Sequence, residues 1–395
     1  MSEPAILVLN AGSSSLKFQV FDLAGSALDT VLHGQIDGIG ADAAFRVRDG
    51  AGRTIHAEDL DDSRLGTPQA ALAHLTGWLH GALAGWRLAG VGHRVVHGGT
   101  AYSRPVRVDG TVLTTLEGLV PLAPLHQPHN LAPIRALVAS DPGLPQVACF
   151  DTAFHRTQPL EAELFALPMR YYDEGVRRYG FHGLSYEHVG GRLAEIAPEI
   201  ARGRIVVAHL GSGVSMCALR DGRSIATTMG FTALDGCPMG TRTGSLDAGV
   251  VLHLARERRM DLDRIEQLLY RESGLLGLSG IAADMRELES SADPRARVAI
   301  DYFTYRIARE AGSLASALGG LDALVFTAGI GENSAAVRAA VCDRLGWLGV
   351  TIDAAANRNG ATRLDAVGSR VAVLRVPTDE ERMIARHTRD VLGLH

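Results

Sequence analysis

The chain carries the same short pattern twice: a buried-type strand, a turn of small residues, and a strand in which apolar and polar residues alternate. In the first copy, AILVLNAGSSSLKFQVFDLAG, Leu16, Phe18 and Val20 alternate with polar neighbours. The second copy, RIVVAHLGSGVSMCALRDG, begins at Arg204. One such hairpin in each half predicts a duplicated architecture. Coincidence between two Gly/Ser hairpins is the alternative.

Strands and helices alternate in the rest of the chain. The Ala/Leu-rich residues 68–83 are typical of a helix, and a second helix is expected to begin near Ala132, after an irregular, proline-rich stretch. Residues 146–150 and 323–327 read as strands. The second of these leads into the glycine loop AGIGENS at 328–334, and a helix is expected to follow. This order predicts the α/β class.

A Pro/Gly break at Asp141-Pro-Gly-Leu-Pro is the candidate domain boundary. A length of 395 residues suits two or three domains. We therefore expect an N-terminal domain over 1–150 and a second domain over 151–381.

Composition excludes several classes of protein. Hydrophobic residues make up 46% and charged residues 21%, which excludes a disordered chain. A net charge of −5 without a basic tract argues against binding to nucleic acid or a membrane surface. No apolar run approaches the ~18 residues of a membrane span, and no signal peptide is recognisable. Four widely spaced cysteines fit a reducing compartment, so a cytoplasmic protein is expected.

The first turn, NAGSSSLKF, has the chemistry of a phosphate cradle. Its backbone N–H groups and serine hydroxyls can surround an anion, and Lys17 adds a positive charge. Asn10 could hold a metal through water or its carbonyl oxygen. The spacing is not that of a P-loop. A tight hairpin with solvated serines is the alternative.

Three charged residues stand at positions that suggest a function as well as a structural role. Arg94 interrupts an apolar strand pattern, so it either pairs structurally or points into a cleft towards a carboxylate or phosphate. Asp151 ends a strand, a usual place for a metal-binding or catalytic carboxylate, although an N-cap is the alternative. Arg242 lies in the Gly/Thr-rich MGTRTG, which suggests anion binding unless the loop is simply solvated.

Two glycine-rich segments suggest a nucleotide site. TAGIGENS follows a strand and opens a helix, where backbone can approach a phosphate, although Ser334 departs from the dinucleotide fingerprint. In GLLGLSGIAADMR, Asp284 could read ribose hydroxyls and Arg286 could stack on a base; surface capping is equally open. Taken with the duplicated hairpins, these features favour a two-domain phosphotransferase.

The motifs together resemble the acetate kinase (acetokinase) family. They are NAGSSSLKF, VGHRVVHGG, CFDTAFH, RRYGFHGLS, MGTRTG, GLLGLSGI-x-x-DMR and GIGENS, in this order, and the resemblance runs from residue 5 to about 390. It implies two ribonuclease-H-like, actin-like ATPase domains, with a C-terminal helix at about 382–395 that packs back on the first. It also implies a homodimer that reversibly transfers phosphate from ATP to acetate with Mg²⁺ (or Mn²⁺), giving acetyl phosphate and ADP.

The resemblance also implies roles for individual residues. Asp151, His182 and Arg242 would be catalytic, and Asn10 and Glu380 would be associated with the metal. The acyl substrate would contact Arg94, Val96, Leu125, Phe181 and Ala233. The nucleotide and its phosphates would contact Ser13, Ser15, Lys17, His209, Leu210, Gly211, Ser212, Gly213, Asp284, Met285, Arg286, Gly329, Ile330, Gly331, Glu332 and Asn333.

Four positions depart from the usual family motifs. The usual HLGNG is HLGSG in this chain, with Ser212, and the usual PTNEE is PTDEE, with Asp379. The usual LHNP is LHQP, with Gln127, and the usual FTPLEG is FTALDG, with Ala233. None removes a charged catalytic group, so activity is expected. Because a carboxylic acid is already ionised at neutral pH, Asp151 is expected to hold metal-bound water and geometry rather than to remove a proton. A propionate kinase and a chaperone- or actin-like ATPase are the rival interpretations, and the acyl-site arginines argue against the second.

Overall fold

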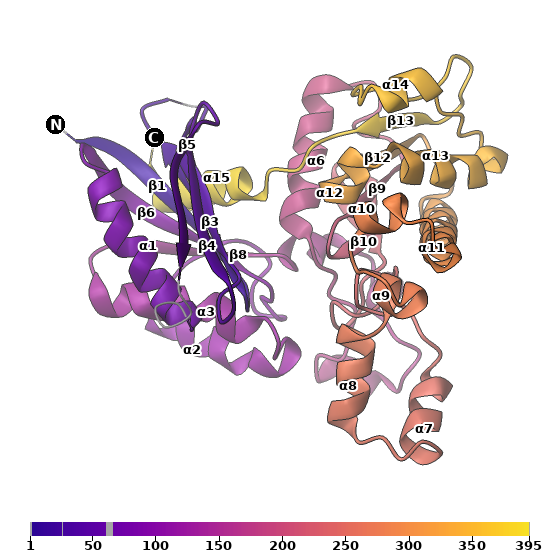
Figure 1. Cartoon of the computed structure of the whole chain (residues 1–395), viewed down its shortest axis with the longest axis horizontal. Coiled ribbons are helices and arrows are strands. Elements are labelled where there is room, and N and C mark those ends of the chain that lie inside the picture. The colour runs from indigo at the N-terminus through magenta and orange to yellow at the C-terminus, as the bar shows by residue number, and fades with distance from the viewer. Residues whose placement is uncertain (1, 26, 61–65, 395) are drawn as a thin grey trace. The chain divides into compact units, whose positions relative to one another are not determined.

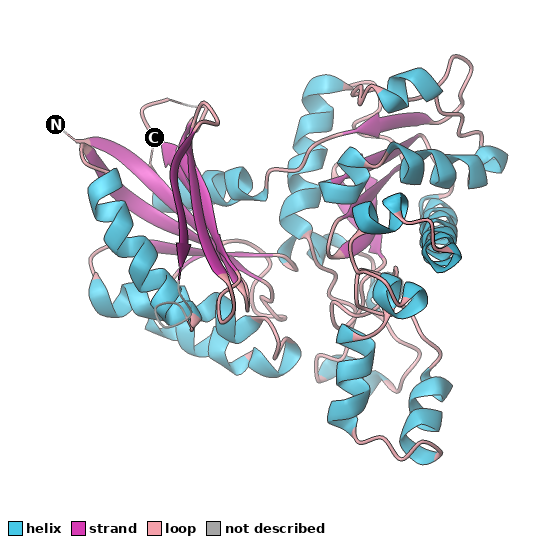
Figure 2. Ribbon diagram, viewed as in Figure 1, coloured by secondary structure: helices cyan, strands magenta, loops and turns pink. Residues whose placement is uncertain are grey.

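The computed structural model describes residues 2–25, 27–60 and 66–394, and its contacts divide the chain into two compact units. The first unit contains the residues up to Phe154 and those from Asp379 onward; the second runs from His155 to Thr378. Figure 1 colours the chain by residue number, and Figure 2 marks its helices and strands. Within the described residues, no helix is long and apolar enough to cross a membrane.

A mixed sheet in the order β5-β4-β3-β2-β1-β6-β8-β7 forms the centre of the first unit. The strands are β1 (Glu3–Ala11), β2 (Ser15–Asp22), β3 (Thr30–Asp37), β4 (Ala43–Asp49), β5 (Thr54–Leu60), β6 (Trp86–Val95), β7 (Val106–Arg107) and β8 (Gln146–Phe150). The helices are α1 (Pro68–Ala82), α2 (Gly110–Gly118), α3 (Gln127–Ser140) and α15 (Glu380–Leu392), with short 3₁₀ turns at Val120–Leu122 and Ala153–Thr157.

Alternation along β6 assigns different neighbours to the two faces of this sheet. Val91 is buried in the core that α1 and α3 share with β1 and β2, with Leu75 and Leu137 as members from the helices. Gly90 and Gly92 point to the other face, where they lie against α15. In β1 every residue from Ala5 to Leu9 is buried, as expected for a strand covered on both sides.

The second unit repeats the central part of this topology. Its sheet has the order β11-β10-β9-β12-β13. In the first unit, β1 pairs antiparallel with β2 on one side, and the parallel strands β6 and β8 follow on its other side. In the second unit, β9 likewise pairs antiparallel with β10, and the parallel strands β12 and β13 follow on its other side. The duplicated architecture predicted from the two hairpins is therefore present, and its strand order rules out coincidence.

The elements of the second unit cover this smaller sheet. Its strands are β9 (Ile205–Leu210), β10 (Val214–Arg220), β11 (Arg223–Thr227), β12 (Ala323–Thr327) and β13 (Ala372–Arg375). Its helices are α4 (Leu160–Glu163), α5 (Met169–Asp173), α6 (Gly183–Ile196), α7 (Ala248–Arg256), α8 (Leu262–Arg271), α9 (Gly274–Ser279), α10 (Met285–Ser290), α11 (Pro294–Leu318), α12 (Ala328–Asn333), α13 (Ala335–Arg344) and α14 (Ala354–Arg358), with a 3₁₀ turn at Gly346–Leu348. In Figure 1 the sheet lies between α6 and α11.

The contacts between residues set the unit boundaries a few residues away from those expected at 150/151 and 381/382. Asp151 and Glu380 both lie in the first unit, because their carboxylates approach Arg94 of β6. The whole of α15, from Glu380, packs against β1, β6 and β8.

Two local expectations were wrong. Helix α3 begins at Gln127 rather than near Ala132. Pro128 stands in the first turn, where no intrahelical N–H bond is needed, and Pro133 is tolerated inside because Leu131 and Ile134 are fully buried. The stretch expected as a glycine loop at 328–334 is largely helical, because Ala328–Asn333 forms α12. In contrast, β8 and β12 are as predicted.

The close approach of α15 to β6 gives a test of the fold. A Cβ atom at Gly92 would stand 2.6 Å from Ile384 Cγ2 and would also meet Thr388 Oγ1. We expect Gly92→Ala to lower the free energy of unfolding by about 1–3 kcal/mol, because α15 must move away from the sheet. Urea unfolding of the full chain measures this change.

Gly77→Ala in α1 is the matched control. Nothing lies within 4 Å of a Cβ at Gly77, which is inside a helix, so alanine there should stabilise by up to about 1 kcal/mol. Equal stability of the Gly92→Ala variant and the wild type would contradict the described packing of α15.

Candidate active site

A buried ion pair forms at the carboxyl ends of β6 and β8 in the first unit. Arg94 donates from Nε to Asp151 Oδ1 (3.0 Å) and from Nη2 to Oδ2 (2.7 Å). The Asp151 side chain is 1% exposed and that of Arg94 is 25% exposed. The bidentate bond fixes the plane of the guanidinium while part of it remains accessible. The structure therefore contains the ion pair, and the accessible part of the Arg94 guanidinium leaves a contact with a carboxylate or phosphate open as well.

Asn10 and the first residues of α15 complete this cluster. Glu380 Oε2 lies 3.7 Å from Arg94 Nε, and Asn10 Oδ1 accepts a long hydrogen bond of 3.4 Å from Arg94 Nη1. Asn10 Nδ2 donates to Glu381 Oε1, also at 3.4 Å. Thus strands β1, β6 and β8 and the N-terminus of α15 each contribute a polar group to one place.

The cluster contains more negative than positive charge. Burial is the main cause that raises the pKa of Glu380 to about 7; Asp151 and Glu381 raise it further, and Arg94 and Lys17 oppose them. For Arg94, burial alone would lower the pKa, but Asp151, Glu380 and Glu381 outweigh it and the pKa rises. A further cation would therefore be stabilised here.

The oxygen ligands of the cluster suit a hard divalent cation. The carboxylate of Glu380 and the amide oxygen of Asn10, both sequence-predicted metal residues, lie beside the same guanidinium. Magnesium is often held by only one or two carboxylates, with water and substrate phosphates completing its coordination. Among the described residues there is no group of three or more His, Cys, Asp or Glu side chains that could hold a metal alone. The residues present thus fit a metal shared with a bound phosphate.

The serine turn between β1 and β2 is tight and faces solvent. Gly12 N donates to Ser15 O at 2.8 Å, and Ser13 and Lys17 are exposed. Lys17 pairs with Asn10 across the hairpin and contributes positive charge near Glu380. This arrangement is compatible with both the phosphate cradle and the solvated hairpin.

A buried asparagine that the sequence reasoning missed holds two strand ends together. Asn130 of α3 accepts from Val96 N (2.9 Å) and donates to Ala11 O (2.6 Å). Gln127, a departure from the family motif, is fully buried and donates to the carbonyls of His97 and Leu116. These bonds fix the backbone at Val96, one of the predicted acyl-site residues. Leu125, another of them, is half-buried.

In the second unit, His182 lies at the start of α6 with a left-handed backbone (φ 57°). Its Nδ1 is 2.8 Å from Ser215 Oγ, and its ring stacks on that of His209 with centroids 4.1 Å apart. The neighbouring Phe181 is buried, and its carbonyl lies 2.9 Å from His155 Nε2. His182 is therefore held by side chains from two strands of the sheet.

Arg242 lies in a loop that other groups brace. Arg242 Nη1 donates to Ala233 O at 3.1 Å and contacts Met239 Sδ at 3.5 Å. Arg178 Nη1 donates to Asp235 Oδ2 (3.0 Å), and Ser245 Oγ donates to Asp235 Oδ1 (2.7 Å). The loop is thus an ordered structure, and its predicted acyl-site residue Ala233 holds Arg242 through the backbone.

A cavity of about 650 Å³ in the second unit gathers eight of the sixteen predicted nucleotide residues. Its lining comprises Gly211, Ser212, Ala283, Asp284, Met285, Arg286, Glu289, Gly329, Ile330, Asn333 and Ser334. Asp284 caps α10 and also pairs with Arg286, whose side chain is 88% exposed. The capping role left open for Asp284 is therefore present, and Arg286 still lines the cavity with most of its side chain exposed. Glu289 and Ser334, which bond each other, were missed by the sequence reasoning.

Several predicted residues do not line this cavity. Leu210 and Gly331 are buried in the fold. The Glu332 carboxylate accepts from Ala328 N (2.8 Å) and Thr378 N (3.1 Å), so it serves the backbone. His209 is bonded to Ser185, and Gly213 faces the His182 ring.

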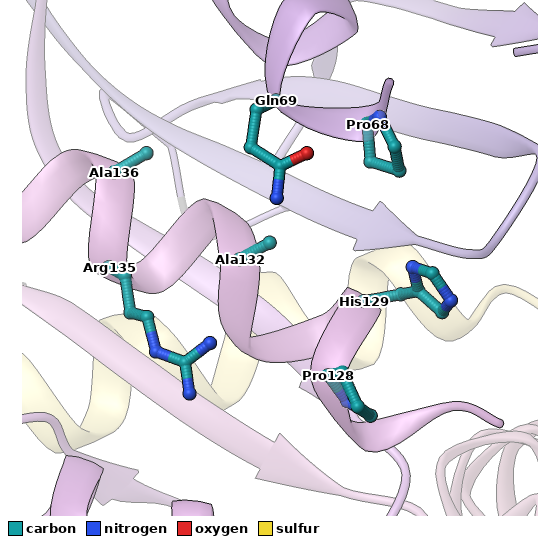
Figure 3. A pocket seen from close by; sticks show the side chains of 7 residues that line it. All are labelled: Pro68, Gln69, Pro128, His129, Ala132, Arg135 and Ala136. Carbon is teal, nitrogen blue, oxygen red and sulfur yellow. The ribbon is translucent and has the colours of Figure 1, made fainter. Parts of the chain in front are cut away.

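A second cavity, in the first unit, contains none of the predicted site residues. It has a volume of about 450 Å³ and lies between α1 and α3, as Figure 3 shows, with His129 and Arg135 on its α3 side. Arg135 donates to Glu117 Oε1 at 2.7 Å, so its charge is already paired. This cavity is separate from the polar cluster around Arg94.

Comparisons with known proteins agree on one family. The model of the acetokinase family matches residues 5–386. An acetate kinase of Nitrobacter hamburgensis is 55% identical over 98% of this chain and 96% of its own length. An acetate kinase of Rhizobium meliloti is 52% identical over 97% of each chain.

Solved structures give the same result. A propionate kinase from Francisella tularensis has a TM-score of 0.91 and 35% identity, covering 99% of this chain and all of that one. The acetate kinase of Porphyromonas gingivalis has a TM-score of 0.88 and 34% identity, covering 98% of this chain and all of that one. The fold is thus that of two ribonuclease-H-like domains, and the chain is a phosphotransferase with a carboxyl group as acceptor. It belongs to the acetokinase family.

Proposed function

We propose that the chain is an acetate kinase that reversibly transfers the γ-phosphate of ATP to acetate, giving acetyl phosphate and ADP. The observation that carries this proposal is the Arg94 guanidinium, which Asp151 fixes through two nitrogens while a quarter of the side chain remains exposed. Within residues 2–25, 27–60 and 66–394, the hydrogen bond of Nη1 is the long one to Asn10, so this nitrogen has capacity for the carboxylate of a small acid. A hydroxamate-trapping assay for acyl phosphate with acetate, propionate and butyrate tests the proposal directly.

Catalysis here would rest on charge and position. The acceptor carboxylate is ionised at neutral pH and has no proton to lose. Arg94 would bind it, while Arg242 and His182 would stabilise negative charge on the transferring phosphoryl group in an in-line transfer. The bidentate bond to Arg94 supports a positioning role for Asp151, because both of its oxygens already accept hydrogen bonds.

Asn10 and Glu380 would hold Mg²⁺ (or Mn²⁺), which when bound neutralises charge on the nucleotide phosphates. The excess of carboxylates around Arg94 supports this assignment.

The cavity lined by Gly211, Asp284 and Gly329 would take the nucleotide, since its size is in the usual range for such ligands.

A propionate-preferring kinase is the second candidate. Its support is the alanine at position 233, together with the structural similarity to a propionate kinase. We place acetate first because the relatives with the higher identities that we report are acetate kinases.

A homodimer is also proposed. Helix α7 has no buried residue, and the segment around it exposes Leu246, Val250, Leu252 and Leu262. The side chain of Leu262 is 77% exposed, and apolar patches of this kind usually mark an interface. We propose a cytoplasmic location, which the small number of widely spaced cysteines supports.

Arg242 gives a test of charge stabilisation. We expect Arg242→Ala to lower kcat on the order of 10²–10³-fold, because a contact to the developing charge is lost. Steady-state kinetics with acetate and ATP measure this effect. Arg309→Ala, which removes an exposed arginine beside Tyr305, is the control and should leave kcat unchanged. A near-wild-type kcat for Arg242→Ala would remove Arg242 from the mechanism.

Asp151→Asn separates positioning from proton removal. The variant keeps the shape but removes a charge that binds Arg94, so we expect a severe loss of kcat and a higher Mg²⁺ requirement. The same loss should destabilise the first unit by a few kcal/mol, because Arg94 loses its main partner. Solvent isotope effects on kcat in H₂O and D₂O provide the distinguishing measurement. A clear effect in the wild type that disappears in Asp151→Asn would favour general-base catalysis instead.

Ala233→Pro tests the acyl pocket. Alanine is smaller than the proline usual in the family, so the wild type should use acetate best, propionate substantially and butyrate poorly. One methylene is worth about 0.8 kcal/mol in apolar surroundings, so discrimination is limited to ~1–3 kcal/mol. We expect Ala233→Pro to shift the ratio of kcat/KM for propionate and acetate towards acetate. An unchanged ratio would show that residue 233 does not limit the pocket.

A further inference from the structure

The ring of His182 is held by a chain of buried hydroxyl groups. Its Nδ1 lies 2.8 Å from Ser215 Oγ, and the same oxygen is hydrogen-bonded to Tyr186 Oη. Ser215 and Tyr186 are fully buried, the first on β10 and the second on α6. A histidine at the start of a helix is thus tied both to the sheet beneath it and to its own helix.

The number of protons limits how these bonds can be arranged. A serine hydroxyl has one proton, so Ser215 can donate to only one of its two partners and must accept from the other. If Tyr186 donates to Ser215 and Ser215 directs its one proton to Nδ1, the proton of the neutral imidazole is on Nε2. The reverse order, or a serine that accepts from both partners, would put the proton on Nδ1.

We propose that Ser215 and Tyr186 are positioning residues that orient the His182 ring and keep its proton on Nε2. The proposal rests on the proposed function, in which His182 contacts the transferring phosphoryl group. In this arrangement Tyr186 donates to Ser215, Ser215 donates to Nδ1, and Nε2–H is the group that donates to the phosphoryl oxygen.

The position of Nε2 supports this role. A Cβ atom at Gly213 would stand 3.0 Å from Nε2 and 3.2 Å from Cε1. Gly213 belongs to the small-residue turn between β9 and β10, and the same turn contributes Gly211 and Ser212 to the lining of the nucleotide cavity. The protonated nitrogen therefore faces the turn closest to the expected phosphates, and the absence of a side chain at Gly213 leaves it room.

The neighbouring histidine has a parallel arrangement. His209 pairs with Ser215 across β9 and β10, and its ring stacks on His182. Thr378 Oγ1 donates to Ser185 Oγ (2.8 Å), and Ser185 Oγ lies 2.8 Å from His209 Nδ1, to which it can donate its own proton. Two imidazolium ions with centroids 4.1 Å apart would repel, so the stack disfavours protonation of both rings at once, and in a neutral ring the tautomer matters.

The experiment compares three variants. Ser215→Ala removes both bonds to the hydroxyl, and Tyr186→Phe removes only the outer one while the ring remains. Ser224→Ala is the matched control, because Ser224 is a fully buried strand residue of the same unit whose Oγ lies 2.9 Å from His155 Nδ1. It removes the same kind of Ser–His bond without touching His182.

We expect Ser215→Ala to lower kcat on the order of a hundredfold, with little change in the KM values for ATP and acetate. Tyr186→Phe should lower kcat by a factor of about five, and Ser224→Ala should leave it unchanged. Thermal unfolding of all variants separates these effects from a general loss of stability. If Ser215→Ala fails to fold while the control folds, Tyr186→Phe tests the proposal in its place. A kcat equal to that of the wild type, together with an unchanged His182 ¹⁵N spectrum, would then overturn it.

A spectroscopic measurement tests the tautomer without relying on activity. In protein labelled with ¹⁵N-histidine, the His182 signal among the 15 histidines is identified by its absence in His182→Gln. The wild type should show Nε2 protonated and Nδ1 unprotonated, and Ser215→Ala should show a mixture of tautomers. A proton on Nδ1 in the wild type, or a kcat equal to that of the wild type in Ser215→Ala, would overturn the proposal. Absence of acetate kinase activity with the expected tautomer intact would instead refute the proposed function.

Discussion

The ion pair between Arg94 and Asp151 is the interaction on which the first unit's site depends. A buried carboxylate without a partner would be strongly destabilising, so Asp151 requires the guanidinium. The pair also explains why the end of the chain returns to its beginning: Glu380 at the start of α15 reaches the same arginine. The glycines of β6 let α15 lie close to the sheet and bring that carboxylate there.

The same hairpin is used differently in the two units. In the first, the turn after β1 is followed by Lys17, and Asn10 beside it contacts Arg94. In the second, the turn after β9 lies beside His182 and one edge of a cavity. A duplicated fold thus offers two equivalent turns at strand ends, and the chemistry of each is set by the side chains that neighbouring elements bring to it.

Local patterns were sufficient for much of the fold. The strands at 146–150 and 323–327 were predictable because each depends on neighbouring residues. The start of α3 was not, because burial of Leu131 and Ile134 overrides the prolines. Motifs identified Arg94, Asp151 and His182 as candidates. Ser215, which bonds His182, and Asn130, which bonds the backbone of Val96 and Ala11, carry no local signal, since nothing near either residue indicates which distant group it will bond.

These partners account for how the candidate groups could act without changing protonation. Asp151 is bound through both oxygens to a guanidinium that stays charged, and we propose that the hydroxyl chain keeps His182 in one neutral tautomer. A carboxylate acceptor brings no proton to remove, so a site for it needs fixed donors more than a base. Under the proposed function, two buried networks, one ionic around Arg94 and one of neutral hydroxyls around His182, would meet that need by holding each donor in place before the reactants bind.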